Sequence, residues 1–118
     1  MLSGKGLGRV PAEQWRVLGG ASRYDANELA RRLCISTRQL QRVFRLQFDR
    51  SPQDWLNEQR ILRARELLLS GSHSVKEVAL DLGFKQVSHF CRQFKLRNHL
   101  TPSEFATGNF LAVDVADR

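Results

Sequence analysis

A tandem repeat constrains this chain more than any other feature of its sequence. The segment QRVFRLQFDRSP at residues 41–52 is followed 50 positions later by CRQFKLRNHLTP at residues 91–102. Positions that keep their chemical type at this offset include Leu40 and Phe90, Arg42 and Arg92, Phe44 and Phe94, Arg45 and Lys95, Ser51 and Thr101, and Pro52 and Pro102. A repeat of this length predicts two copies of one supersecondary unit within the 118 residues.

Start signals predict that both copies are helical. Asp25, Ser36 and Ser74 are each followed three residues later by Glu or Gln, which is a capping pattern. Ser51 and Thr101 each precede a proline, and proline is favoured at the first position of a helix. We therefore expect helices at about 26–33, 37–48, 52–70, 75–82, 86–97 and 102–107, and a short one at about 11–18 that ends before Gly19.

Each copy has the pattern of a short helix, a tight turn and a second helix, which is the helix-turn-helix arrangement. Ala30 and Ala79 let the two helices cross closely, and Cys34 and Gly83 occupy the turn four residues later. The predicted fold is all-α, with two helix-turn-helix subdomains joined by a long linker helix. The expected segments are a flexible N-terminal arm with a short first helix at 1–24, a first helix-turn-helix at 25–50, the linker helix at 51–71, a second helix-turn-helix with a closing helix at 72–107, and a C-terminal tail at 108–118.

The net charge of +7 favours a polyanionic partner, most often nucleic acid. No apolar run approaches the roughly 20 residues that cross a membrane. The first residues, MLSGKGLGRVP, lack the apolar stretch of a secretory signal. We expect a cytoplasmic, nucleoid-associated protein that does not contact a membrane.

The second helix of each copy carries most of the candidate DNA contacts. At about 100° per residue, apolar side chains form one stripe and basic side chains lie opposite. Arg and Gln can form paired hydrogen bonds with guanine and adenine edges in the major groove of double-stranded DNA. The expected base-reading residues are Arg38, Gln41, Arg42, Ser88, His89 and Arg92, and the expected phosphate contacts are Arg45, Arg60, Lys85 and Lys95.

The segment between the copies predicts how the two second helices are spaced. Residues 51–70 form one amphipathic pattern, and a helix of that length spans about 30 Å. One turn of B-DNA is about 34 Å long. We therefore expect a monomer that reads two successive major grooves and needs no palindromic site.

A set of motif residues extends over most of the chain: Trp55, Leu56, Arg60, Ala64, Val75, Lys76, Glu77, Val78, Ala79, Gly83, Phe84, Ser88, His89, Phe90, Arg92, Phe94, Lys95, Thr101 and Pro102. With these residues, the chain from about 25 to 106 resembles the DNA-binding domain of the AraC/XylS family of bacterial transcription regulators. The resemblance implies seven helices in two helix-turn-helix subdomains. It also implies activation or repression of promoters, often through contact with RNA polymerase.

The chain departs from the family pattern in the first copy and at two helix ends. Asp49 and His99 stand where the family usually has glycine, so both must tolerate the backbone geometry that ends a helix. Cys34 takes the turn position that Gly83 fills in the second copy. The family's first helix is represented only by the short segment PAEQWRVL before Gly19.

No catalytic set, metal site or cofactor is expected, and we predict that the protein is not an enzyme. His89 and Cys91 are too few for zinc, which takes four ligands. One alternative is that the chain is the DNA-binding fragment of a longer, effector-responsive regulator. Two others keep the fold but not the base recognition: a basic helical module that binds an acidic protein, and an RNA-binding protein.

Overall fold

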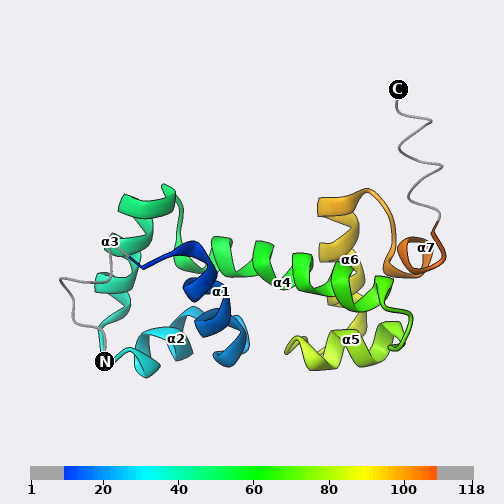
Figure 1. The fold of residues 1–118 in the computed structure, drawn as a ribbon, viewed down its shortest axis with the longest axis horizontal. Helices are drawn as coiled ribbons and strands as arrows, with labels where there is room; N and C mark the ends of the chain where they lie inside the picture. The colour runs from blue at the N-terminus through cyan, green and yellow to red at the C-terminus, as the bar shows by residue number, and fades with distance from the viewer. Residues whose placement is uncertain (1–9, 109–118) are drawn as a thin grey trace. The chain divides into compact units, whose positions relative to one another are not determined.

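The computed structural model describes residues 10–108, and within this range every regular element is an α-helix (Figure 1). The helices are α1 (Ala12–Ala21), α2 (Ala26–Arg32), α3 (Thr37–Phe48), α4 (Pro52–Leu69), α5 (Val75–Asp81), α6 (Val87–Asn98) and α7 (Pro102–Ala106). The predicted all-α class is confirmed. The chain divides into two compact units between Arg60 and Ile61, inside α4. Those parts of the predicted arm and tail that fall at 1–9 and 109–118 lie outside the described residues.

Unit 1 is built from α1, α2, α3 and the first half of α4 around an aromatic core. The rings of Trp15 and Phe44 are both fully buried, with centroids 4.8 Å apart. Trp55 of α4 lies 5.5 Å from Phe44 in an edge-on arrangement, which aromatic pairs favour. Leu40 and Val43 are buried beside them, so the predicted inner stripe of α3 is confirmed.

Helix α1 is longer than its sequence indicated, and the expectation that it ends before Gly19 is wrong. It continues through both glycines to Ala21 because Gly19 is a site of close packing and not a stop. A Cβ atom on Gly19 would lie only 2.6 Å from Cδ2 of Leu56, so the absence of a side chain lets α1 approach α4. The helix ends at Ser22, whose hydroxyl donates to the carbonyl of Leu18 at 2.8 Å.

Unit 2 contains the second half of α4 together with α5, α6 and α7. Phe90 and Phe94 of α6 are fully buried, in agreement with the apolar stripe predicted for the second helix of each copy. The ring of Phe94 lies 5.4 Å from that of Phe105 in α7, and the guanidinium of Arg65 lies 5.3 Å from the centroid of Phe105. One side of α6 therefore packs against α5 and α7, and the opposite side is exposed to solvent.

Capping boxes set the first residues of three helices, and a helix start was predicted at each of them. In each box a hydroxyl accepts a backbone N–H three residues on, and the side chain there accepts the backbone N–H of the cap. The pairs are Ser36 with Gln39, Ser74 with Glu77, and Thr101 with Glu104. The carboxylates of Glu77 and Glu104 accept these hydrogen bonds from the backbone N–H groups of Ser74 and Thr101, which lowers the pKa of each carboxyl group below the ordinary value for glutamate.

The residues that end α3 and α6 adopt the left-handed backbone conformation, which is strained for any residue other than glycine. Asp49 has a φ of 56° and His99 a φ of 64°, and the amide of each donates back into the helix, to the carbonyl of Arg45 or Lys95. Cys34, in the turn of the first copy, has a φ of 59°. A residue with a side chain in this region is disfavoured relative to glycine, so the expectation of strain at Asp49 and His99 is confirmed in geometry.

Replacing His99 by glycine is expected to raise the free energy of unfolding by about 0.5–1 kcal/mol, because relief of left-handed strain exceeds the entropy that glycine adds to the unfolded chain. Asp49→Gly should have a smaller effect, because aspartate enters this region more readily than histidine. Urea denaturation of the two variants and the parent protein measures both effects. A His99→Gly protein less stable than the parent would contradict the strain at this helix end.

Candidate nucleic-acid interface

The outward face of α3 brings four of the predicted contact residues together. Arg38, Gln41, Arg42 and Arg45 are all exposed, while the opposite side of the same helix is buried in the core of unit 1. With Ser51 they line a hollow of about 380 Å³, called the arginine hollow below. The helix period predicted this grouping, because residues three, four and seven apart share one face.

The outward face of α6 repeats this arrangement in unit 2. Ser88, His89, Arg92 and Lys95 are exposed, opposite the buried phenylalanines. Lys85 is also exposed and precedes the first turn of the helix. The imidazole of His89 lies against the ring of Phe84 in an edge-on contact, with 5.6 Å between the ring centroids. This contact helps to hold the orientation of the imidazole.

The arginines on these two faces differ in their partners from four other arginines of the described residues. Arg31, Arg32, Arg50 and Arg63 form ion pairs with neighbouring carboxylates. Across residues 10–108, by contrast, no ion pair involves any of the outward arginines, which are Arg38, Arg42, Arg45 and Arg92. Their charge is left for a polyanion, because an arginine already paired with a carboxylate has less to gain from a phosphate or a base.

Arg60 lies elsewhere than the other predicted phosphate contacts. Its guanidinium is half-buried in unit 1, and Nη2 donates to the carbonyl of Arg23 at 3.4 Å, in the turn between α1 and α2. Burial lowers its pKa, and the nearby Asp25 opposes that effect. Arg60 does not line the arginine hollow, and its position supports the turn that leads into α2.

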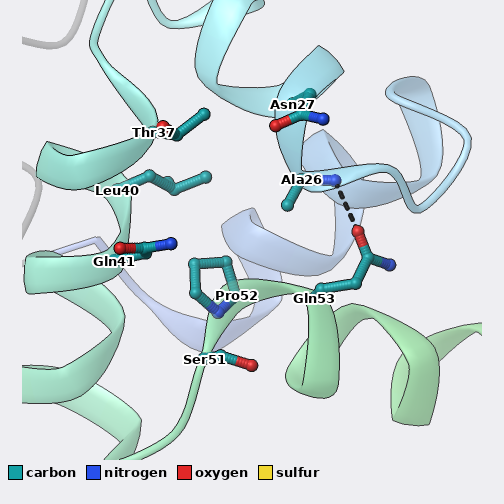
Figure 2. Close-up of a pocket in the computed structure, with 8 residues that line it drawn as sticks. All are labelled: Ala26, Asn27, Thr37, Leu40, Gln41, Ser51, Pro52 and Gln53. Carbon is teal, nitrogen blue, oxygen red and sulfur yellow. Dashed lines mark hydrogen bonds between the residues drawn. The ribbon is translucent and has the colours of Figure 1, made fainter.

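A second hollow, which the sequence did not indicate, adjoins the first. It has a volume of about 280 Å³ and lies where the first turns of α2, α3 and α4 converge (Figure 2). Its lining residues are Ala26, Asn27, Thr37, Leu40, Gln41, Ser51, Pro52 and Gln53, and it is called the polar hollow below. Sequence periodicity could not find it, because its side chains come from three separate helices.

The sequence interpretation also did not predict that two leucines are exposed on the second helices. Leu46 on α3 is 80% exposed and Leu96 on α6 is 67% exposed, at equivalent positions of the repeat. The repeat itself was the signal that could have found them, because both belong to the duplicated segment.

Two further expectations concern sites of other kinds. Over residues 10–108, no cluster of three or more His, Cys, Asp or Glu side chains is arranged to hold a metal ion. In the same range, no helix combines the length and the apolar character needed to cross a membrane. Cys34 and Cys91 are both free thiols.

Two helix-turn-helix units, each with a basic outward face on its second helix, define the class of this chain: it is a helix-turn-helix DNA-binding protein. The family model described as "Helix-turn-helix domain" matches residues 29–108. With that match and the relatives below, the chain belongs to the AraC/XylS family of transcription regulators and comprises a DNA-binding domain of that family. Helix-turn-helix regulators of this kind bind double-stranded DNA.

Curated relatives share the domain but are longer proteins. The HTH-type transcriptional regulator ArgR of Pseudomonas aeruginosa is 35% identical over 78 residues, which cover 66% of this chain and 24% of the relative. The arabinose operon regulatory protein of Escherichia coli (strain K12) is 33% identical over 87 residues, 74% of this chain and 30% of the relative. The virulence regulon transcriptional activator VirF of Yersinia enterocolitica is 32% identical over 78 residues, 66% of this chain and 29% of the relative. The chain thus spans less than a third of the length of these relatives.

Solved structures agree with this assignment. A DNA-binding transcriptional dual regulator from Escherichia coli K-12 has a TM-score of 0.68 at 25% identity, over 79% of this chain and 86% of that chain. The C-terminal domain of the two-component response regulator yesN from Fusobacterium nucleatum has a TM-score of 0.68 at 27% identity, over 80% of this chain and 96% of that chain. The predicted pair of helix-turn-helix subdomains is confirmed at the level of the fold.

Proposed function

We propose that this protein binds specific double-stranded DNA sequences as a monomer, with α3 and α6 in two successive major grooves. The observation that carries the proposal is the equivalence of Arg42 and Arg92. Each is exposed at the same repeat position of its unit, opposite a buried stripe, and neither is paired with a carboxylate in residues 10–108. Arginine is the side chain that forms the commonest specific contact with guanine in the major groove.

The proposed roles divide the two faces into base-reading and phosphate-binding residues. Base contacts carry sequence information, whereas phosphate contacts fix register and orientation. The proposed base-reading residues are Arg38, Gln41 and Arg42 in unit 1, and Ser88, His89 and Arg92 in unit 2. The proposed phosphate contacts are Arg45, Lys85, Lys95 and Arg60, of which Arg60 is half-buried while the others are exposed.

The proposed spacing rests on the continuity and length of α4. Its 18 residues correspond to a rod of about 27 Å, comparable with the roughly 34 Å of one DNA turn. Because the two units follow each other in one chain, no two-fold axis is required and the DNA site need not be a palindrome. Footprinting should show an asymmetric site protected over two adjacent major grooves, and a site bound only by a symmetric dimer would contradict this part of the proposal.

The setting of this activity is proposed from the relatives. One of them is described as a transcriptional activator and another as an operon regulatory protein. We propose that this protein acts at promoters in the cytoplasm, with RNA polymerase as a protein partner. Because those relatives are more than three times as long as the matched region, we also propose an additional effector-responsive domain as the alternative setting for this DNA-binding unit.

A binding selection from random duplex DNA tests the central proposal. The expected result is an enriched asymmetric sequence that is bound far more tightly than competitor duplex across a series of salt concentrations. Equal retardation of all duplexes and of RNA would favour the RNA-binding alternative. Failure to bind any nucleic acid at moderate salt would favour a module that binds an acidic protein.

Arg45→Ala is expected to weaken binding to all DNA sequences alike, because a phosphate contact carries no base information. The slope of log K against log salt should fall by about 0.9, the value for the loss of one neutralised phosphate. Lys95→Ala should behave in the same way, whereas Arg60→Ala should also lower the free energy of unfolding, because Arg60 bonds the carbonyl of Arg23. Titrations on the selected site and on unrelated duplex, at four salt concentrations, measure these effects. A changed base preference with an unchanged slope would count against the role of Arg45.

A further inference from the structure

The polar hollow of unit 1 is lined by hydrogen-bonding side chains but by no charged side chain, unlike the arginine hollow that adjoins it. Five of its eight lining residues are polar and uncharged: Asn27, Thr37, Gln41, Ser51 and Gln53. Figure 2 shows Thr37, Leu40 and Gln41 on α3 at one side, Asn27 on α2 above, and Pro52 and Gln53 on α4 below. Leu40 and Pro52 are buried, so the floor is apolar and rigid while the polar groups stand at the rim.

The polar lining residues fall into two groups by their hydrogen bonds. Gln53 is fully engaged: it accepts the backbone N–H of Ala26 at 2.9 Å and donates to Tyr24 O and Asn57 Oδ1 (Figure 2). Ser51 caps α4 by accepting the amide of Asp54 at 3.1 Å. These bonds hold the wall of the hollow in place.

The second group is free of such bonds. Within residues 10–108, the exposed side chains of Asn27, Thr37 and Gln41 form no hydrogen bond to another protein group. The two amides and the hydroxyl are therefore available to an external partner, on a surface that the first group of hydrogen bonds holds rigid.

The polar hollow adjoins the arginine hollow, since Gln41 and Ser51 line both. A polyanionic strand bound at the arginine hollow would therefore lie next to the polar hollow, whose rim includes Asn27 and Thr37. Hydroxyl and amide side chains are common partners of DNA phosphates, together with Arg and Lys. A small-molecule occupant fits less well, because the rim side chains are exposed and 280 Å³ lies below the usual range for ligand pockets.

We propose that the polar hollow binds one backbone phosphate of the bound DNA, through hydrogen bonds donated by the amide of Asn27 and the hydroxyl of Thr37. The inference rests on the proposed function and adds to it a phosphate contact made without a cation. Gln41, on the boundary between the two hollows, links this phosphate to the base-reading face of α3.

The absence of charge has a measurable consequence. A cationic side chain that neutralises a phosphate releases counterions, so its loss changes the salt dependence of binding. A neutral donor contributes a hydrogen bond without that release. Loss of Asn27 or Thr37 should therefore lower the affinity for every DNA sequence while the salt slope stays as in the parent protein.

The repeat supplies matched substitutions for this test. Thr37 and Val87 are the first residues of α3 and α6, so Thr37→Val replaces the hydroxyl with a methyl group of similar size and installs the residue that unit 2 already has there. Asn27 and Lys76 are the second residues of α2 and α5, so Asn27→Lys converts the neutral contact into a cationic one. Both side chains are exposed and make no hydrogen bond within residues 10–108, and thermal unfolding verifies that the variants are folded.

The experiment measures binding of Thr37→Val, Asn27→Ala and Asn27→Lys to the selected duplex and to unrelated duplex over a salt series. Thr37→Val and Asn27→Ala should each weaken both complexes about three- to tenfold, as expected for one lost hydrogen bond, with the parent salt slope. Asn27→Lys should steepen the slope by about 0.9. A control substitution on the same unit, Val17→Thr on the exposed side of α1, should leave binding unchanged.

Duplexes carrying a single methylphosphonate, scanned along the site, locate the contact. At one position the losses caused by the methylphosphonate and by Thr37→Val should be less than additive, because both remove the same hydrogen bond. Additive losses at every position, or a Thr37→Val protein that binds like the parent, would overturn the inference. In that case the parent protein still selects its sequence, whereas failure of the proposed function would appear as a parent protein with no sequence preference.

Discussion

Replacement of Arg42 by alanine is expected to weaken binding to the best duplex by about 1–3 kcal/mol and to relax base preference in one major groove only. Arg42 is exposed on α3, lines the arginine hollow and forms no ion pair in residues 10–108. Its removal therefore deletes the proposed base contact without disturbing the core, and the free energy of unfolding should change by less than about 0.5 kcal/mol.

Arg92→Ala should have the same kind of effect in the other groove, about one helical turn of DNA away. The outward face of α3 holds three arginines, whereas α6 has Ser88 at the place of Arg38. We therefore expect Arg42→Ala to be the more damaging of the two. Binding selections with each variant identify the base positions that relax. If both variants lost preference at the same bases, or at none, the model of one groove for each helix would fail.

Phe44→Ala is expected to lower the free energy of unfolding by about 3–5 kcal/mol, a large part of the total stability of a small domain. The ring is fully buried and contacts Trp15, Phe48 and Trp55 at centroid distances of 4.8, 5.2 and 5.5 Å. Its loss leaves a cavity among rigid aromatic neighbours that cannot close around it. Base preference in the groove proposed for α3 should be lost together with stability.

Leu46→Ala is the matched control for this prediction, since it removes an apolar side chain two positions further along the same helix. Leu46 is 80% exposed, so its removal should change the free energy of unfolding by less than about 0.5 kcal/mol. Urea denaturation of the two variants measures the difference. Similar losses in both would mean that Phe44 is not the centre of the unit 1 core.

Local sequence signals located most helix starts because the interactions that start a helix lie within one turn of the chain. Ser36, Ser74 and Thr101 act through a residue three positions away, and each helix begins directly after them. The outward faces of α3 and α6 were predictable for a related reason. Once a segment is helical, its period alone decides which side chains lie opposite the buried stripe.

Features that depend on contacts between distant segments were not predictable in this way. A glycine pair normally disfavours a helix, yet α1 continues through Gly19 because the side chain of Leu56 occupies the space beside it. Arg60 belongs to a motif of charged and apolar residues along α4, and only the fold places its guanidinium against the carbonyl of Arg23.

The sequence by itself determined the all-α class, the duplication and the basic outward face of each second helix, because these follow from residue spacing within single helices. The tertiary structure decided which outward arginines lack an ion pair within residues 10–108, that Arg60 is half-buried, and that Asn27 and Thr37 share a hollow with Gln41. Burial of Trp15, Phe44 and Trp55 in one core brings α1, α2, α3 and α4 of unit 1 together. Side chains from different helices therefore become neighbours through packing of the core, and no periodicity within one segment specifies that packing.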